Sequence, residues 1–186
     1  MKNLLQANKN LILEIIAVLS GAAYTILISY GSLWCWLFAI ISSIAFIYLC
    51  FSKRLLAETG LHTFYLAMGF YGFYSWDTAE GGFAPISLGW EYNFIIIIAA
   101  GGLSIISGHL LKRHSKAALP YLDAFTTIFS IIATFMMVGM VLENWIYWIV
   151  IDALSIYLYS KRGLYLSALL YLAYIGLAIN GLINWL

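Results

Sequence analysis

Charge is scarce in this chain. Of its 186 residues only 9% are Asp, Glu, Lys or Arg, whereas 64% are hydrophobic, and the mean hydropathy is +0.95. Soluble domains carry about 25% charged and about 45–50% apolar residues. The composition therefore excludes a soluble globular protein and indicates a polytopic membrane protein, with no soluble domain left once the apolar runs are removed.

Motifs for metal binding, disulfides and catalysis are also missing. Cys35 and Cys50 lie on one predicted helix, about 22 Å apart by helical rise, which excludes a disulfide between them. His62, His109 and His114 show no metal-ligand spacing. The segment "GGLSIISGH" lacks the G-x-S-x-G pattern of a serine hydrolase, and no Walker motif is present. We therefore expect no cofactor, no metal and no enzyme activity.

Apolar runs predict an all-α integral membrane protein with seven transmembrane helices. A helix needs about 20 residues to cross the hydrocarbon core. The first run shares its acid and its spacing with a later run and lacks a cleavage site, so we expect a retained helix and not a signal peptide. The predicted spans are residues 11–30, 33–51, 56–76, 92–111, 122–142, 145–160 and 163–186.

Basic residues all fall on one side of the predicted membrane. The opposite side carries acids only, namely Asp77, Glu80, Glu91 and Glu143. The positive-inside rule then predicts the N-terminus inside and the C-terminus outside. The basic residues are Lys2, Lys9, Lys53, Arg54, Lys112, Arg113, Lys116, Lys161 and Arg162.

An internal repeat organises the chain. One constant shift along the sequence superposes Trp36 on Trp145 and Gly72 on Gly181 without a gap, and we call it the repeat offset. It predicts a first three-helix repeat (1–76), a segment with an outer loop, a linker helix and a basic inner loop (77–121), and a second three-helix repeat (122–186). Four crossings separate equivalent points, so the two repeats are parallel. Transporters with such repeats bind substrate between them, near the membrane midplane.

Seven tryptophans lie toward the predicted outer face. Indole rings favour the headgroup level, which predicts an interfacial belt. Trp148 is the deepest of the seven, and its repeat counterpart is Ala39, so the fold does not require an indole there. The belt is expected to comprise Trp34, Trp36, Trp90 and Trp185.

An acid, Asp152, stands within the sixth predicted span. Its counterpart is Ser43, and an acid near the bilayer centre costs a few kcal/mol, which implies a use or a partner. Trp145, Trp148 and Asp152 follow i, i+3, i+7 spacing and share one helix face. This face suits a flat, cationic heteroaromatic ligand, which would stack on an indole beside the counter-charge. The alternatives are a structural hydrogen bond from a protonated carboxyl and proton coupling.

Two asparagines add polar candidates. Asn144 lies near the edge of the same face, and Asn180 in the seventh span has Tyr71 as its counterpart. A carboxamide at either position could orient ligand hydroxyls.

The motifs "ENWIYWIVIDALSIYLYSKRGLY", "PYLDAFTTIFSIIAT", "SLWCWLFAIISS" and "YGFYSW" resemble the PnuC family of bacterial vitamin transporters. The resemblance implies a SWEET-like architecture of two three-helix units around a linker helix, inserted the other way up from SWEETs. It also implies a multi-pass protein of the bacterial inner membrane, and facilitated uptake of nicotinamide riboside, or of thiamin or riboflavin in subgroups. A cytosolic kinase then traps the substrate by phosphorylation.

Two residues depart from the family pattern. Phe73 stands where many members have tryptophan in Y-G-W-x-x-W, and Asp152 replaces the asparagine of W-x-x-x-N. Nicotinamide riboside and thiamin each carry a ring cation that suits an acid, whereas riboflavin is neutral and fits less well.

The sequence thus predicts a uniporter for nicotinamide riboside, with thiamin as the alternative. A non-transport membrane protein or an intramembrane enzyme is the alternative of another class. Expected partners are the substrate, the lipid bilayer and the kinase, without nucleic acid, and a homo-oligomer is left open. The predicted substrate-binding residues are Trp148, Asp152, Asn144, Asn180, Tyr71, Ser75 and Trp76.

Overall fold

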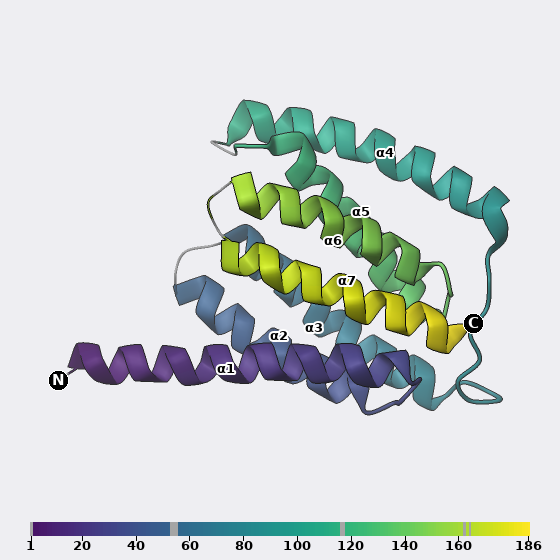
Figure 1. The fold of residues 1–186 in the computed structure, drawn as a ribbon, viewed down its shortest axis with the longest axis horizontal. Coiled ribbons are helices and arrows are strands. Elements are labelled where there is room, and N and C mark those ends of the chain that lie inside the picture. The colour runs from purple at the N-terminus through teal and green to yellow at the C-terminus, as the bar shows by residue number, and fades with distance from the viewer. Residues whose placement is uncertain (1, 53–55, 116–117, 162, 164) are drawn as a thin grey trace. The chain divides into compact units, whose positions relative to one another are not determined.

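A computed structural model describes residues 2–52, 56–115, 118–161, 163 and 165–186 (Figure 1). Lys53, Arg54, Lys116 and Arg162 lie outside the described residues, and the side chains of residues 2–10, 56, 57, 166 and 167 are not described. Within the described part the expected all-α fold with seven helices is confirmed. The helices are α1 (Lys2–Ser29), α2 (Cys35–Ser52), α3 (Leu56–Asp77), α4 (Gly89–His114), α5 (Pro120–Val138), α6 (Asn144–Lys161) and α7 (Tyr165–Trp185).

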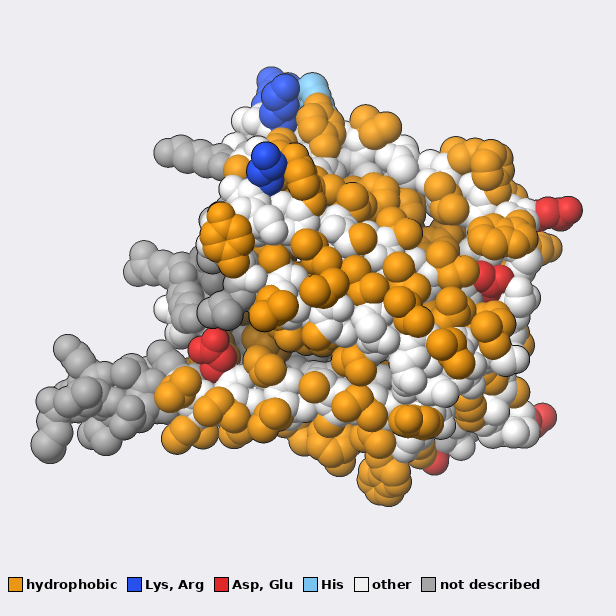
Figure 2. Space-filling model, in the orientation of Figure 1, with side chains coloured by type: hydrophobic (Ala, Val, Ile, Leu, Met, Phe, Trp, Pro, Cys, Tyr) orange, Lys and Arg blue, Asp and Glu red, His pale blue; other side chains and the backbone are white. Residues whose placement is uncertain are grey.

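Five of these helices, α1, α2, α4, α5 and α7, are long and apolar enough to cross a membrane. Hydrophobic side chains cover much of the surface in view, and Lys and Arg side chains gather near the ends of α4 and α6 (Figure 2). Helices α3 and α6 have 22 and 18 residues but more polar side chains, such as Glu58 and Asp152. Membrane crossing by these two helices stays a prediction. They carry most of the candidate site residues, and polar groups within a membrane face the protein interior or a ligand and not lipid.

The chain divides into two compact units, the first ending at Phe83 and the second beginning at Ala84. In the first unit α2 contacts both α1 and α3, and the buried Ser42 hydroxyl donates a hydrogen bond to the Ala17 carbonyl at 2.8 Å. In the second unit α5 contacts α4 and α6, and α6 contacts α7. The threefold division into repeat, linker segment and repeat stays a prediction.

The predicted repeat offset reappears in the helix bounds. The shift that carries Trp36 onto Trp145 also carries both ends of α2 onto the ends of α6, the last residue of α1 onto that of α5, and the first residue of α3 onto that of α7. The turns match as well, because Gly31 and Met140 occupy equivalent positions with φ of 65° and 53°. A parallel, SWEET-like arrangement of the repeats stays a prediction.

The fifth predicted span was too long. It was expected to reach Leu142, but α5 ends at Val138. The chain leaves the helix because Met140 takes a left-handed conformation, which L-residues with side chains rarely adopt, and Val141 then pairs with Ile86 in an isolated β-bridge.

One aromatic contact recurs in both units. In each, a glycine of the last helix faces an indole of the preceding helix, and a second tryptophan meets that indole edge-on. The ring centroids are 5.3 Å apart at 90° in the first unit and 5.2 Å apart at 84° in the second. The members of these Trp–Gly–Trp contacts are Trp36, Gly72 and Trp76, and Trp145, Gly181 and Trp185.

This contact corrects the expected tryptophan belt. Trp36 and Trp185 are only 1% and 5% exposed, because each is packed within a Trp–Gly–Trp contact. Trp34 and Trp90 are 63% and 73% exposed, as a belt at the membrane surface requires. The belt interpretation was therefore wrong for Trp36 and Trp185.

Candidate functional site

One face of α6 carries the central candidates. Asn144, Trp148 and Asp152 follow one another at every fourth position, so they line the same side of the helix. Asn144 and Asp152 are buried, and Trp148 is half-buried against the core between α4, α5 and α6. Trp145 is not one of these central candidates, because its ring packs against Gly181 of α7.

The Asp152 carboxyl lies in the protein interior. It is 4% exposed, and it makes no hydrogen bond or ion pair with any group in the described part of the chain. The Tyr174 hydroxyl on α7 is near enough to interact with it electrostatically. A buried acid without a cationic partner is costly, so a ligand cation at this place would recover much of that cost.

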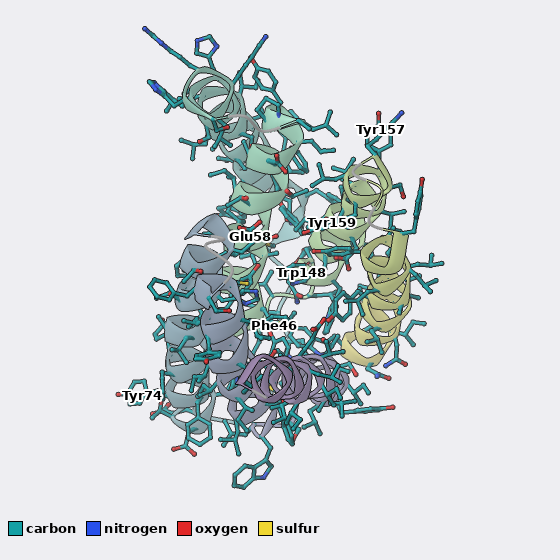
Figure 3. All side chains as sticks on the ribbon, turned by 90° about the vertical axis from the view of Figure 1, so that its left-hand side faces the viewer. Phe46, Glu58, Tyr74, Trp148, Tyr157 and Tyr159 are labelled. Atoms are coloured by element: carbon teal, nitrogen blue, oxygen red, sulfur yellow. The ribbon has the colours of Figure 1, made fainter. Side chains whose placement is uncertain are left out.

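Trp148 offers both a ring face and a donor. Its indole N–H is buried and has no hydrogen-bond partner among the residues that the structure describes. Figure 3 shows Trp148 and Tyr159 on the same side of α6, while Tyr157 lies on the other side and is 52% exposed. The Trp148 side of α6 is thus the protein-facing side.

The two asparagines differ in their surroundings. The Asn144 amide group donates to the Val141 carbonyl at 2.6 Å, which helps to close the turn before α6. Its side-chain oxygen is buried without a partner in the described residues, so it retains an acceptor that could take a hydrogen bond from a ligand hydroxyl. Asn180 lies on the exposed side of α7.

The remaining three candidates belong to α3 in the first unit. Tyr71 is 53% exposed and Ser75 is half-buried. Trp76 is 6% exposed, because it packs edge-on against Trp36 and also contacts Phe83 at 5.3 Å between ring centroids. Packing therefore accounts for the burial of Trp76, and substrate contacts by these three residues stay predictions.

An aromatic cluster beside the α6 face was missed by sequence reasoning. Tyr159 stacks on Tyr171 with centroids 5.1 Å apart, and Tyr171 meets Tyr174 edge-on at 6.1 Å. The pattern recurs in the first unit, where His62 stacks on Phe46 at 4.6 Å and meets Tyr65 edge-on at 5.9 Å. The internal repeat could have indicated this cluster, because the repeat offset places His62 on Tyr171 and Tyr65 on Tyr174.

The sequence matches the model of the nicotinamide mononucleotide transporter family over residues 11–186. The chain belongs to this family. The match covers α1 from residue 11 onward and the whole of the other six helices, and it confirms the resemblance to the PnuC family that the motifs indicated.

Three relatives that resemble this chain over most of its length are named as vitamin transporters. The nicotinamide riboside transporter PnuC of Haemophilus influenzae is 27% identical over 184 residues, which cover 93% of this chain and 78% of that protein. The Escherichia coli transporter of the same name is 23% identical, with 94% and 84% covered. The riboflavin/roseoflavin transporter RibM of Streptomyces davaonensis is 24% identical, with 83% and 75% covered.

A solved structure shares the fold. The crystal structure of the vitamin B3 transporter PnuC superposes with a TM-score of 0.76 at 24% identity and covers 99% of this chain and 84% of that one. Together with the family match, this likeness confirms that the protein is a multi-pass transporter of the bacterial inner membrane and not an enzyme.

Proposed function

We propose that this PnuC-family protein carries nicotinamide riboside across the inner membrane as a uniporter. The observation that carries the proposal is the buried Asp152, which stands without a cationic partner in the described chain beside the half-buried ring of Trp148. Nicotinamide riboside combines a flat ring with a positive charge, so it can stack on the indole while its cation faces the carboxylate. The names of the Haemophilus and Escherichia relatives support this choice.

The direction of net uptake would come from chemistry outside this protein. The sequence has no nucleotide-binding motif, so the substrate moves down its own gradient until a cytosolic kinase phosphorylates it and removes it from the equilibrium. Parallel SWEET-like repeats, with the N-terminus inside, would give alternating access to the two sides. The Asn144 and Asn180 carboxamides would orient the ribose hydroxyls.

Thiamin is the second candidate, because its thiazolium ring also combines a flat face with a positive charge. Asp152 favours either cation over neutral riboflavin, although the Streptomyces relative carries a riboflavin name. Competition between unlabelled thiamin and labelled nicotinamide riboside would rank the two cations.

Counterflow into proteoliposomes tests the proposal. Vesicles loaded with unlabelled nicotinamide riboside should accumulate the labelled compound transiently, and empty vesicles should not. The Asp152→Asn variant should weaken binding by about 1–3 kcal/mol if the ion pair is desolvated, whereas the matched Ser43→Ala variant in the first repeat should bind normally.

Three outcomes would contradict parts of this account. No counterflow of any vitamin would contradict transport of this class. Equal binding by wild type and Asp152→Asn would show that Asp152 does not supply a counter-charge to the ligand. A dependence of the uptake rate on an imposed pH gradient would indicate proton coupling through Asp152 in place of uniport.

A further inference from the structure

An acidic side chain in the turn between α5 and α6 caps the start of α4. Glu143 accepts a hydrogen bond from the Ser87 hydroxyl at 2.6 Å, and from the backbone N–H groups of Leu88 and Gly89 at 3.3 Å each. The first N–H groups of a helix have no partner within it, and the positive end of the helix dipole attracts an anion. Glu143 thus supplies the cap that Leu88, at the N-cap position, does not provide.

Backbone contacts reinforce this cap. The Ile86 N–H donates to the Met140 carbonyl at 2.9 Å, and the Leu142 N–H donates to the Ile86 carbonyl at 2.8 Å. The Ala84 N–H also contacts the Met140 sulfur at 3.4 Å. Residues 84–89 are therefore fastened to residues 140–143, and we call this set of contacts the clasp.

Hydrogen bonds within the clasp favour the ionised form of Glu143. Burial raises the pKa of its carboxyl, but the hydrogen bonds from Ser87 and from two backbone N–H groups outweigh burial and lower the pKa below its usual 4.5. Although Glu143 is only 7% exposed, this lowered pKa keeps its carboxylate an anionic acceptor at neutral and mildly acidic pH.

The described residues of the first unit form no equivalent cap. The residue that corresponds to Glu143 by the repeat offset is Trp34, which is 63% exposed. In that unit the turn at Gly31 is packed instead by the ring of Phe83. Phe83 belongs to the first unit and the next residue, Ala84, already contacts Met140, so the clasp begins where the second unit begins.

We propose that Glu143 is a positioning residue for transport: it keeps α4 fastened to the start of α6 throughout the transport cycle and thereby fixes the face that carries Asn144, Trp148 and Asp152. The proposal rests on the proposed function. Glu143 directly precedes Asn144, the first residue of α6, and Trp148 follows one turn later. A displacement of the turn would therefore move the ligand-facing side chains directly.

A reversible cross-link tests whether the clasp stays closed. The Cα atoms of residues paired in a β-bridge are about 5 Å apart, within the range that a disulfide accepts. We expect the Ile86→Cys/Val141→Cys variant, once oxidised, to take up nicotinamide riboside within about twofold of its reduced form. Loss of uptake on oxidation, restored by reduction, would show that the clasp opens in each cycle and would overturn the proposal. The two single-cysteine variants control for oxidation elsewhere.

Substitutions of Glu143 separate positioning from folding. In the folded, monodisperse fraction Glu143→Ala should bind nicotinamide riboside about tenfold more weakly, and Glu143→Gln should recover part of the loss because its carbonyl still accepts hydrogen bonds. Glu91 lies in the first turn of the same helix and outside the clasp, so Glu91→Ala should bind like wild type. Normal binding by folded Glu143→Ala would overturn the proposal.

Hydrogen exchange keeps the two proposals distinct. If wild type binds no vitamin, the proposed function is wrong. Amide exchange then still tests whether Glu143 holds the clasp together. Glu143→Ala should speed exchange at the first turns of α4 and α6, while Glu91→Ala should not. Unchanged exchange in Glu143→Ala would overturn the clasp whatever the substrate.

Discussion

Alanine at Gly181 would drive a methyl group into a buried indole. An ideal Cβ at this position lies 2.5 Å from Trp145, and one at Gly72 lies 2.6 Å from Trp36. Both indoles are 1% exposed and are held from another side by an edge-on tryptophan. Van der Waals contact requires about 3.5–4.0 Å between carbons, so each ring must move by about 1 Å or more.

The energetic consequence can be estimated from two opposing effects. Overpacking of a tight core costs about 1–3 kcal/mol, and the better helix propensity of alanine returns up to about 1 kcal/mol. Subtracting the full propensity gain leaves a net loss of up to about 2 kcal/mol, which should lower the thermal midpoint of Gly181→Ala by up to about 8 °C for a chain of this length. Gly72→Ala should behave alike, because its contact is the repeat counterpart.

Thermal unfolding in detergent, followed by size-exclusion chromatography of the heated protein, measures this effect. Each helix supplies its own control: an added Cβ meets nothing within 4 Å at Gly176 of α7 or at Gly60 of α3. Gly176→Ala and Gly60→Ala should be neutral or slightly stabilising. If Gly181→Ala and Gly72→Ala were as stable as these controls, the Trp–Gly–Trp contacts would not be part of the packed core.

Two further predictions concern the second unit. Trp148→Ala should weaken vitamin binding about tenfold through lost stacking, and Trp148→Phe should weaken it less. A binding titration measures both effects. An equal loss of binding in Trp34→Ala, which changes an exposed tryptophan, would contradict the assignment of Trp148 to the ligand site. Glu143 has a lowered pKa, so its contribution to stability is present above pH 4.5 and is lost as pH falls through the folded-state pKa. The thermal midpoints of wild type and Glu143→Gln should therefore converge as the pH falls below 4.5, and a difference that stays constant on acidification would refute the ionised cap.

Local apolar patterns predicted the helices well. The run 145–160 became α6 (Asn144–Lys161) within one residue at each end, because a long apolar stretch in a membrane must satisfy its backbone hydrogen bonds internally. The end of α5 was missed, because it depends on Met140 and on a bridge to Ile86. That bridge joins residues far apart in sequence, which periodicity does not register.

The burial of the candidate residues was predicted only in part. Asp152 stood out because an acid within an apolar span is costly, and the structure places it in the protein interior. Trp36 was assigned to the membrane surface because indole preference is a statistical tendency, whereas its actual place depends on Gly72 beneath it. The role of Glu143 in capping α4 was not predicted, since acids at a membrane surface are common and only tertiary contacts distinguish this one.

Ligands that differ in charge test whether Asp152 supplies the counter-charge for the substrate. Binding of nicotinamide riboside, thiamin and riboflavin should be titrated by tryptophan quenching on wild type and on Asp152→Asn. The substitution should weaken binding of both cations by about 5–150-fold, equivalent to about 1–3 kcal/mol, and should change riboflavin binding by less than about twofold. Equal losses for all three ligands, or none for the cations, would contradict the claim that Asp152 supplies the counter-charge for a cationic vitamin.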